Sequence, residues 1–305
     1  MSLWPIHPKP YPDELLSSWL MRIAIQFRFN LNSLCRQLLE SNHAAPREID
    51  RVYSDTLIKR LAEGTGQPQE IVREATLVED EGYVYLNRHH GMNHWIFPTT
   101  TFEKMAHHGL AYCPECLAAD AEPYYRKSWR YAFNPVCPVH RRFLKQACPG
   151  CEAPFIYFAM DMIPHDRIMH HCLQCGHWLG DWPAESADPR LIDCLFNIQA
   201  SLAAGIARNT FELPNCGSIP AIAYLQILHA LTYAVRLPKR AAWVLTHYPC
   251  VPADLSLSPL EQDHENLPLE MRSPEAIGTA LCLAGTLIDD WPACVVNLGG
   301  IGAFS

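Results

Sequence analysis

The sequence has few positive charges for a chain of its size. Its 305 residues include 24 lysines and arginines against 32 aspartates and glutamates, which gives a formal net charge of −8. A protein with this balance gains no general attraction to the phosphate backbone, and that attraction supplies most non-specific affinity for duplex DNA. We therefore expect any nucleic acid to be reached mainly through partners rather than by tight, autonomous binding to duplex DNA.

Long apolar runs and targeting features are also missing. No segment reaches the roughly 18 uninterrupted apolar residues of a membrane span, and the opening MSLWPIHPKPYPDELL lacks the basic and apolar regions of a secretory signal. We expect a cytoplasmic protein without membrane association. The sequence contains no recognisable Walker loop, nucleophile elbow or paired carboxylates in a cleft, so no catalytic residues are predicted and the chain is not expected to be an enzyme.

Cysteine, in contrast, is abundant and unevenly spaced. Of the 13 cysteines, seven belong to pairs in which two residues separate the members. A reducing compartment argues against a disulfide framework, so the paired cysteines are interpreted as metal ligands. Free cysteine is among the most buried residue types, and the isolated ones are interpreted as small core residues: Cys35, Cys194, Cys216, Cys250, Cys282 and Cys294.

The paired cysteines form a tandem repeat. CPECLAADAEPYYRKSWRYAFNPVCPVH begins at Cys113, and CPGCEAPFIYFAMDMIPHDRIMHHCLQC begins 35 residues later at Cys148. In each module 20 residues separate two short knuckles, the arrangement of a zinc ribbon. Four protein ligands close a tetrahedral shell, so the sequence predicts two structural zinc ions per chain. The predicted ligands are Cys113, Cys116, Cys137, His140, Cys148, Cys151, Cys172 and Cys175.

The inserts of the two modules differ. The second contains FIYF and RIM, which are predicted to be strands packed over the knuckles. Its neighbouring histidines, His170, His171 and His177, are interpreted as side chains on the surface or beside the ligands rather than as ligands. The first insert is basic and aromatic, which suits either contacts with nucleic acid or a partner, or a packed aromatic strand with a solvated edge. Its basic residues are Arg126, Lys127, Arg130, Arg141, Arg142 and Lys145.

Helical periodicity marks the N-terminal part of the chain. We predict a helix capped by Asp13, a second helix after Asn30, and two more helices on either side of Gly64 to Gly66. The last two have the pattern of a helix-turn-helix. The residues that its second helix is expected to expose are net negative, which favours a packing or partner-binding use over DNA reading: Gln69, Glu70, Arg73 and Glu74.

The C-terminal part is acidic and rich in apolar helix. Residues 185–305 carry six basic and 12 acidic side chains, and the runs IPAIAYLQILHALTYAV and SPEAIGTALCLAGTLIDDWP are predicted to be buried helices. The basic cluster Arg236–Arg240 is interpreted as a helix C-terminal cap. The predicted fold is mainly α with small β zinc ribbons, in three domains: a helix-turn-helix domain over 1–105, tandem zinc modules over 106–184 and a helical domain over 185–305.

HPKPYPDELLSSWLMRIA, together with YCPECLAADAEPYYRKSWRYAFNPVCPVHRRFLKQACPGC, resembles the TniQ family of transposon target-selection proteins, which includes TnsD. The resemblance covers roughly residues 5–185 and implies an N-terminal helix-turn-helix, tandem zinc fingers and a helical C-terminal part. Family members link a target-recognising component to the AAA+ ATPase TnsC or the related TniB, and the family implies no catalytic residues.

The resemblance also implies partners. In CRISPR-associated transposons a TniQ homodimer sits on the RNA-guided Cascade complex, whereas TnsD members bind their attachment site in DNA directly. TnsD proteins continue with further helical domains beyond the point where this sequence ends, at Ser305, so the short TniQ type is expected. The leading hypothesis is a non-enzymatic adaptor between a Cascade-type complex and TnsC; the alternative is a sequence-specific, DNA-binding target selector of the TnsD type.

Overall fold

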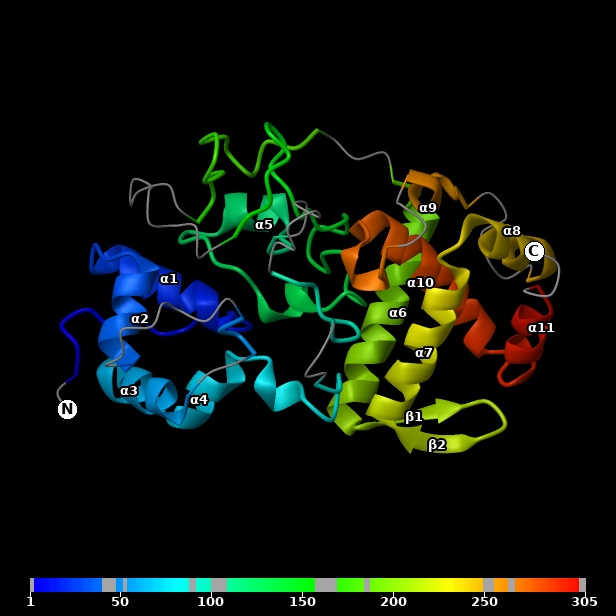
Figure 1. The fold of residues 1–305 in the computed structure, drawn as a ribbon, viewed down its shortest axis with the longest axis horizontal. Coiled ribbons are helices and arrows are strands. Elements are labelled where there is room, and N and C mark those ends of the chain that lie inside the picture. Colours follow the sequence, from blue (N-terminus) through cyan, green and yellow to red (C-terminus); the bar gives the residue numbers. More distant parts are fainter. Residues whose placement is uncertain are drawn as a thin grey trace. The chain divides into compact units, whose positions relative to one another are not determined.

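The computed structural model is mainly helical, with one small two-stranded sheet among the residues that it describes (Figure 1). The described residues are 3–39, 48–51, 54–87, 92–99, 109–156, 169–183, 187–248, 255–262 and 267–301. Contacts divide the chain into two compact units. The first comprises residues 1–79, 98–130 and 145–183, and the second comprises 80–97, 131–144 and 184–305. The three domains proposed from composition remain a prediction.

The first unit contains the N-terminal helices. They are α1 (Leu16–Gln26), α2 (Leu31–Leu39), α3 (Asp55–Thr65), α4 (Gln69–Glu74) and α5 (Pro114–Ala119), with 3₁₀ turns at Val78–Asp80, where the second unit begins, and at Lys127–Arg130. Helix α1 is the centre of this unit, because Trp19, Leu20 and Ile23 have no exposed surface. Burial extends beyond the apolar positions that predicted this helix, because Ser17, Ser18 and Arg22 are buried as well.

The predicted cap of α1 is wrong. Helix α1 begins after Leu15, with no side-chain cap. Asp13 has φ of 60°, and its carboxylate instead accepts hydrogen bonds from the backbone and hydroxyl of Ser128. Asp13 thus binds Ser128, 115 residues away in the chain, instead of capping the helix as the local sequence pattern predicted.

Helices α3 and α4 have the predicted order and separation. The hydroxyl of Ser54 accepts from the amide of Leu57 and caps α3, and Gly66 ends that helix in the left-handed conformation with φ of 69°. Val72 of α4 is buried. On its other face Gln69, Glu70 and Glu74 are exposed, while Arg73 is half-buried and pairs with Asp55, so this surface is as acidic as expected.

A buried ion cluster lies in the first unit. The guanidinium of Arg130, 1% exposed, pairs with Glu48 and Asp50, each at 3.0 Å. Asp50 also accepts from the amide and hydroxyl of Ser17 in α1, at 2.7 and 2.9 Å. Burial raises the pKa of Asp50 to about 6 even though Arg130 opposes that shift. The cluster ties α1 to two segments that are far away in the sequence.

The second unit is a helical layer with a hairpin. Its elements are α6 (Pro189–Arg208), β1 (Thr210–Leu213), β2 (Gly217–Pro220), α7 (Ala221–Val235), α8 (Pro238–His247), α9 (Ser258–Gln262), a 3₁₀ turn at Leu269–Met271, α10 (Pro274–Ile288) and α11 (Ala293–Ile301). Helix α10 packs on both α6 and α7 (Figure 1). Both predicted apolar helices are present; α10 is mostly buried, as predicted, whereas α7 has seven of its 15 residues buried.

The hairpin and the end of α7 have the conformations that their local sequences favour. The hairpin pairs Phe211 with Ile219 in antiparallel register, and Gly217, the first residue of β2, has φ of 76° where the turn ends. Arg236 ends α7 and donates to the carbonyl of Tyr233 at 2.6 Å, which fits the predicted helix cap.

The predicted strands of the second metal module are not present where they can be examined. Phe155 and Ile156 belong to no strand, although both are buried, and Met169 lies in a turn. The remaining residues of FIYF and RIM lie outside the described residues. Around the cysteines the described chain forms isolated bridges such as Val136 to Phe143 and His171 to Trp178. Short knuckles need only such single bridges, because a bound metal can hold the loops together.

Three of the isolated cysteines, Cys35, Cys282 and Cys294, are buried as predicted. Cys194 is half-buried, whereas the prediction is wrong for Cys216, which is exposed beside the hairpin turn; Cys250 lies outside the described residues. Within the described residues, no helix is both long and apolar enough to cross a membrane.

We predict that Arg130→Ala lowers the free energy of unfolding by about 3–5 kcal/mol, since it leaves the buried Asp50 carboxylate without its partner. Arg73→Ala removes an exposed pair with Asp55 and is the matched control, with an expected loss of about 0–1 kcal/mol. Urea denaturation of both variants measures the difference. Equal stability of the two would contradict a structural role for the buried cluster.

Candidate metal centres

The first group of ligands is built from a helix start and a turn. Cys113 precedes the first residue of α5 and Cys116 lies in its first turn, where Pro114 favours helix initiation. Cys137 and His140 share a tight turn in which the amide of Arg141 donates to the carbonyl of Cys137 at 2.9 Å. The amide of His140 also donates to Cys137 Sγ at 3.5 Å, and the His140 Nδ1 atom lies 3.8 Å from that sulfur.

The second group is built from two turns of the same design. The amide of Gly150 donates to Cys148 Sγ at 3.3 Å, and the amide of Gln174 donates to Cys172 Sγ at 3.4 Å. Amides aimed at sulfur favour the thiolate form that binds metal. Gly176, with φ of 73°, makes the tight reversal after the second knuckle.

The distances fit tetrahedral metal binding. The Sγ atoms of Cys148 and Cys175 are 3.7 Å apart, and those of Cys151 and Cys172 are 3.6 Å apart. A tetrahedron with zinc–sulfur bonds of about 2.3 Å requires sulfur–sulfur separations of about 3.8 Å. In each group all four ligand atoms lie within 4.8 Å of one another, and the groups contain the eight sequence-predicted residues. The two groups are thus consistent with two metal ions.

A bound cation would stabilise the thiolate form of the cysteines in the second group. Burial raises the pKa of Cys172, so the thiolate is disfavoured there without a compensating charge. A metal ion would supply that charge and hold both turns in place. The nearby histidines lie outside the group: His177 Nε2 is 3.4 Å from the Asp181 carboxylate, and burial lowers the pKa of His170.

The basic residues of the first insert are dispersed rather than gathered in one exposed patch. Arg126 is half-buried, donates two hydrogen bonds to Asp120 at 3.0 and 2.8 Å, and stacks on Tyr124 and Trp129. Lys127 donates to the carbonyl of Glu74, and Lys145 lies over the Trp182 ring. Arg130 is buried and Arg142 is half-buried. Arg141 is exposed and pairs with Asp193.

Burial of Arg130 removes it from the candidate contact residues, because its guanidinium already binds two carboxylates in the interior. Of the two interpretations of this insert, the packed aromatic one describes Tyr125 and Trp129, which are 1% and 2% exposed. A surface contact role is left as a proposal for the more accessible side chains, of which Arg141 is the most exposed.

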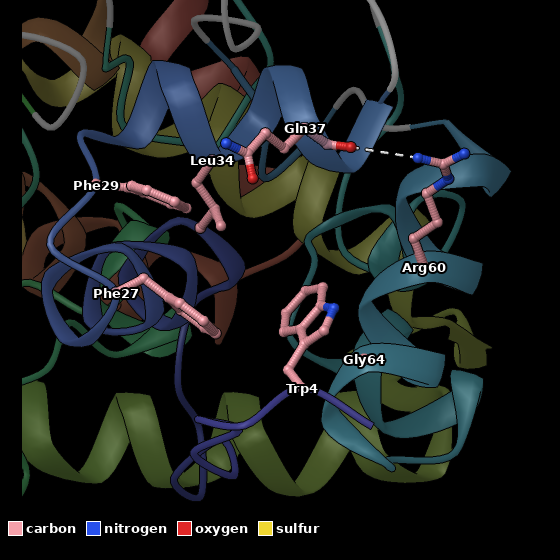
Figure 2. Close-up of a pocket in the computed structure, with 7 residues that line it drawn as sticks. All are labelled: Trp4, Phe27, Phe29, Leu34, Gln37, Arg60 and Gly64. Carbon is pink, nitrogen blue, oxygen red and sulfur yellow. Dashed lines mark hydrogen bonds between the residues drawn. The ribbon is translucent and has the colours of Figure 1, made fainter. Parts of the chain in front are cut away.

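The first unit also contains a hollow that the sequence did not predict. It has a volume of about 220 Å³ and lies between the N-terminal segment and α1, α2 and α3. Figure 2 shows the rings of Trp4, Phe27 and Phe29 around it, with Arg60 donating to the Gln37 carbonyl at its edge. Gly64 lets Trp4 approach, because a Cβ there would lie 2.1 Å from the indole. Trp4, Phe27 and Phe29, which flank α1 in the sequence, are the feature from which this hollow could have been predicted.

Comparison with known protein families supplies the decisive observation: residues 5–144 match the model of TniQ. Residues 5–144 form a TniQ family domain. It includes α1 to α5, the first ligand group and all the basic residues of the first insert except Lys145, and it ends before Cys148 begins the second group. No curated protein matches the chain significantly. TniQ family proteins are transposition adaptors.

We predict that the purified full-length chain contains two metal ions and that Cys148→Ser reduces this to about one, because one sulfur of a closed shell is lost. Cys216→Ser is the matched control, since this cysteine is exposed and lies outside both groups, and it should keep both ions. Elemental analysis after gel filtration measures the ratio. Retention of two ions by Cys148→Ser would contradict the predicted ligand set.

Proposed function

We propose that this chain is a non-enzymatic transposition adaptor that links an RNA-guided, Cascade-type target complex to the AAA+ ATPase TnsC. The single observation that carries the proposal is the TniQ domain over residues 5–144. The adaptor binds zinc in both ligand groups, and it is a homodimer that directs the transposon to the site chosen by its partner.

Closed coordination shells support an adaptor rather than a metal enzyme. Three sulfurs and one imidazole, or four sulfurs, leave no position at which a metal could activate water. The metal's role would be to fix the loops of a small module that cannot bury a large core. Such rigid loops present a constant surface to a partner.

The charges support recognition through a partner. The net charge is −8, and the exposed face of α4 carries Glu70 and Glu74, which repel phosphates. Arg126 is held by Asp120 and Arg141 by Asp193, so binding DNA would have to break existing ion pairs. These observations weigh against the alternative, a DNA-binding selector of the TnsD type.

We predict that the tagged chain co-purifies with both the Cascade-type subunits and TnsC encoded with it, because an adaptor must contact the two together. Co-expression followed by one affinity step and mass spectrometry tests this. Capture of neither partner, by protein that retains both metal ions and its helical circular dichroism, would refute the adaptor proposal.

The same assay identifies the contact surface. Arg141→Glu should reduce capture of a partner, because Arg141 is the most exposed of the predicted contact residues. Lys239→Glu is the matched control: it makes the same charge change at an exposed site in the first turn of α8, where a carboxylate suits the helix dipole. Equal capture by both variants would exclude Arg141 from the interface.

We also predict that the purified chain binds duplex DNA weakly and with little sequence preference. The expected Kd lies in the non-specific range of about 10⁻⁴–10⁻⁶ M at physiological salt, because the net charge is negative. Fluorescence anisotropy with duplexes from the transposon target region and with scrambled duplexes measures this. Nanomolar binding to one duplex would support the DNA-binding selector instead.

A further inference from the structure

Two cysteines outside the metal groups meet across helices α6 and α10. The Sγ atoms of Cys194 and Cys282 are 2.8 Å apart, inside the van der Waals contact of two sulfurs. The residues are 88 positions apart in the chain, so the contact is a product of tertiary packing. Both belong to the second compact unit, and neither is among the residues that form the two ligand groups.

Glycines let the two helices approach at this point. Gly278 and Gly285 lie one turn before and one turn after Cys282 and therefore share its face of α10. A Cβ at Gly278 would lie 2.8 Å from the Leu195 side chain, and one at Gly285 would lie 3.0 Å from that of Ile198. Contact this tight brings the backbones close, and a disulfide needs its two Cα atoms to be about 4.4–6.8 Å apart.

The pair is accessible from one side. A hollow of about 390 Å³ is lined by both cysteines and by polar groups that include Asn197, Ser201 and Asp289. Cys194 is half-buried, whereas Cys282 is 1% exposed. A small reagent entering the hollow therefore reaches Cys194 first, and Cys282 lies behind it.

We propose that Cys194 and Cys282 are a redox modification site, which forms a reversible disulfide when a low-molecular-weight disulfide such as oxidised glutathione is present. The site is separate from the metal groups and goes beyond the adaptor function.

The two cysteines have different roles in the exchange. A hydrogen bond from the Cys282 thiol lowers the pKa of Cys194, whereas the same bond, together with burial, raises the pKa of Cys282. The Cys194 thiolate attacks one sulfur of oxidised glutathione, which forms a mixed disulfide and releases one glutathione thiolate. Cys282 loses its proton and attacks Cys194 Sγ, which releases the second glutathione. Two protein thiols are thereby oxidised, one small disulfide is reduced to two thiols, and the two protons end on glutathione.

The bond would join two helices that pack on each other in this unit. Helix α10 packs on α6 and α7, and the disulfide would fasten α10 to α6 across a long stretch of chain. A cross-link that closes a long loop removes conformations from the unfolded state and so stabilises the folded unit. The native packing already places the sulfurs in contact, so little rearrangement is needed.

The test uses the full chain with its metal bound, incubated in glutathione buffers of increasing oxidised fraction. Free thiols are then blocked with N-ethylmaleimide, and the digest is mapped by mass spectrometry without reduction. We expect a linked peptide pair containing Cys194 and Cys282 in most chains, a rise in Tm on the order of 10 °C, and reversal of both by dithiothreitol. Metal content, measured on the same samples, should stay unchanged.

Variants separate the two roles. Cys282→Ala should leave Cys194 as a mixed disulfide with glutathione, while Cys194→Ser should abolish the linked peptide and the rise in Tm. Cys216→Ser, which changes an exposed cysteine outside the pair, should behave as the parent does. Parental chains that keep their helical circular dichroism but retain both thiols, or stop at the mixed disulfide, would overturn the proposal. A linked peptide found only in chains that have lost their metal would do the same.

Discussion

Convergence of four ligand atoms on one point is the constraint on which the TniQ domain and the module after it depend. In the second group, thiols from turns 20 residues apart in the sequence approach to 3.6 and 3.7 Å, and backbone amides donate to the sulfurs. Four thiols this close do not stabilise one another, whereas a bound cation would stabilise them as thiolates. The described loops around them contain isolated bridges rather than named strands, so a bound metal would supply the order that a sheet would otherwise give.

The first unit combines the second ligand group with the largely buried helix α1 and with buried charges. Helix α1 has no exposed surface at Trp19, Leu20 or Ile23, while Arg130 and Asp50 form an ion pair beside it. A buried pair is costly to break, because either partner alone remains an uncompensated charge. This explains why one basic residue of an insert that looked suited to nucleic acid is internal. It also concentrates any partner contact on the few cations that stay accessible.

The second unit is held together differently, by close helix packing. Gly278 and Gly285 remove side chains where α10 meets α6, and the two cysteines fill the space between them. The same close approach creates the geometry for a disulfide. One added covalent bond between closely packed helices would stabilise this unit further, whereas the metal modules are expected to depend on a bound ion.

The sequence by itself determined the ligand sets, the helical character of both ends and the position of the helix-turn-helix pattern. These depend on fixed spacing: two residues between knuckle cysteines, the period of a helix, and a glycine with φ of 69° at a helix end. Other features were decided only by the tertiary structure. Ser128 takes Asp13 away from the start of α1, two carboxylates draw Arg130 into the interior, and helix packing brings Cys194 to Cys282. In each case the partner lies more than 70 residues away in the chain. Local spacing carries no information about such distant partners, because only the folded chain brings them into contact.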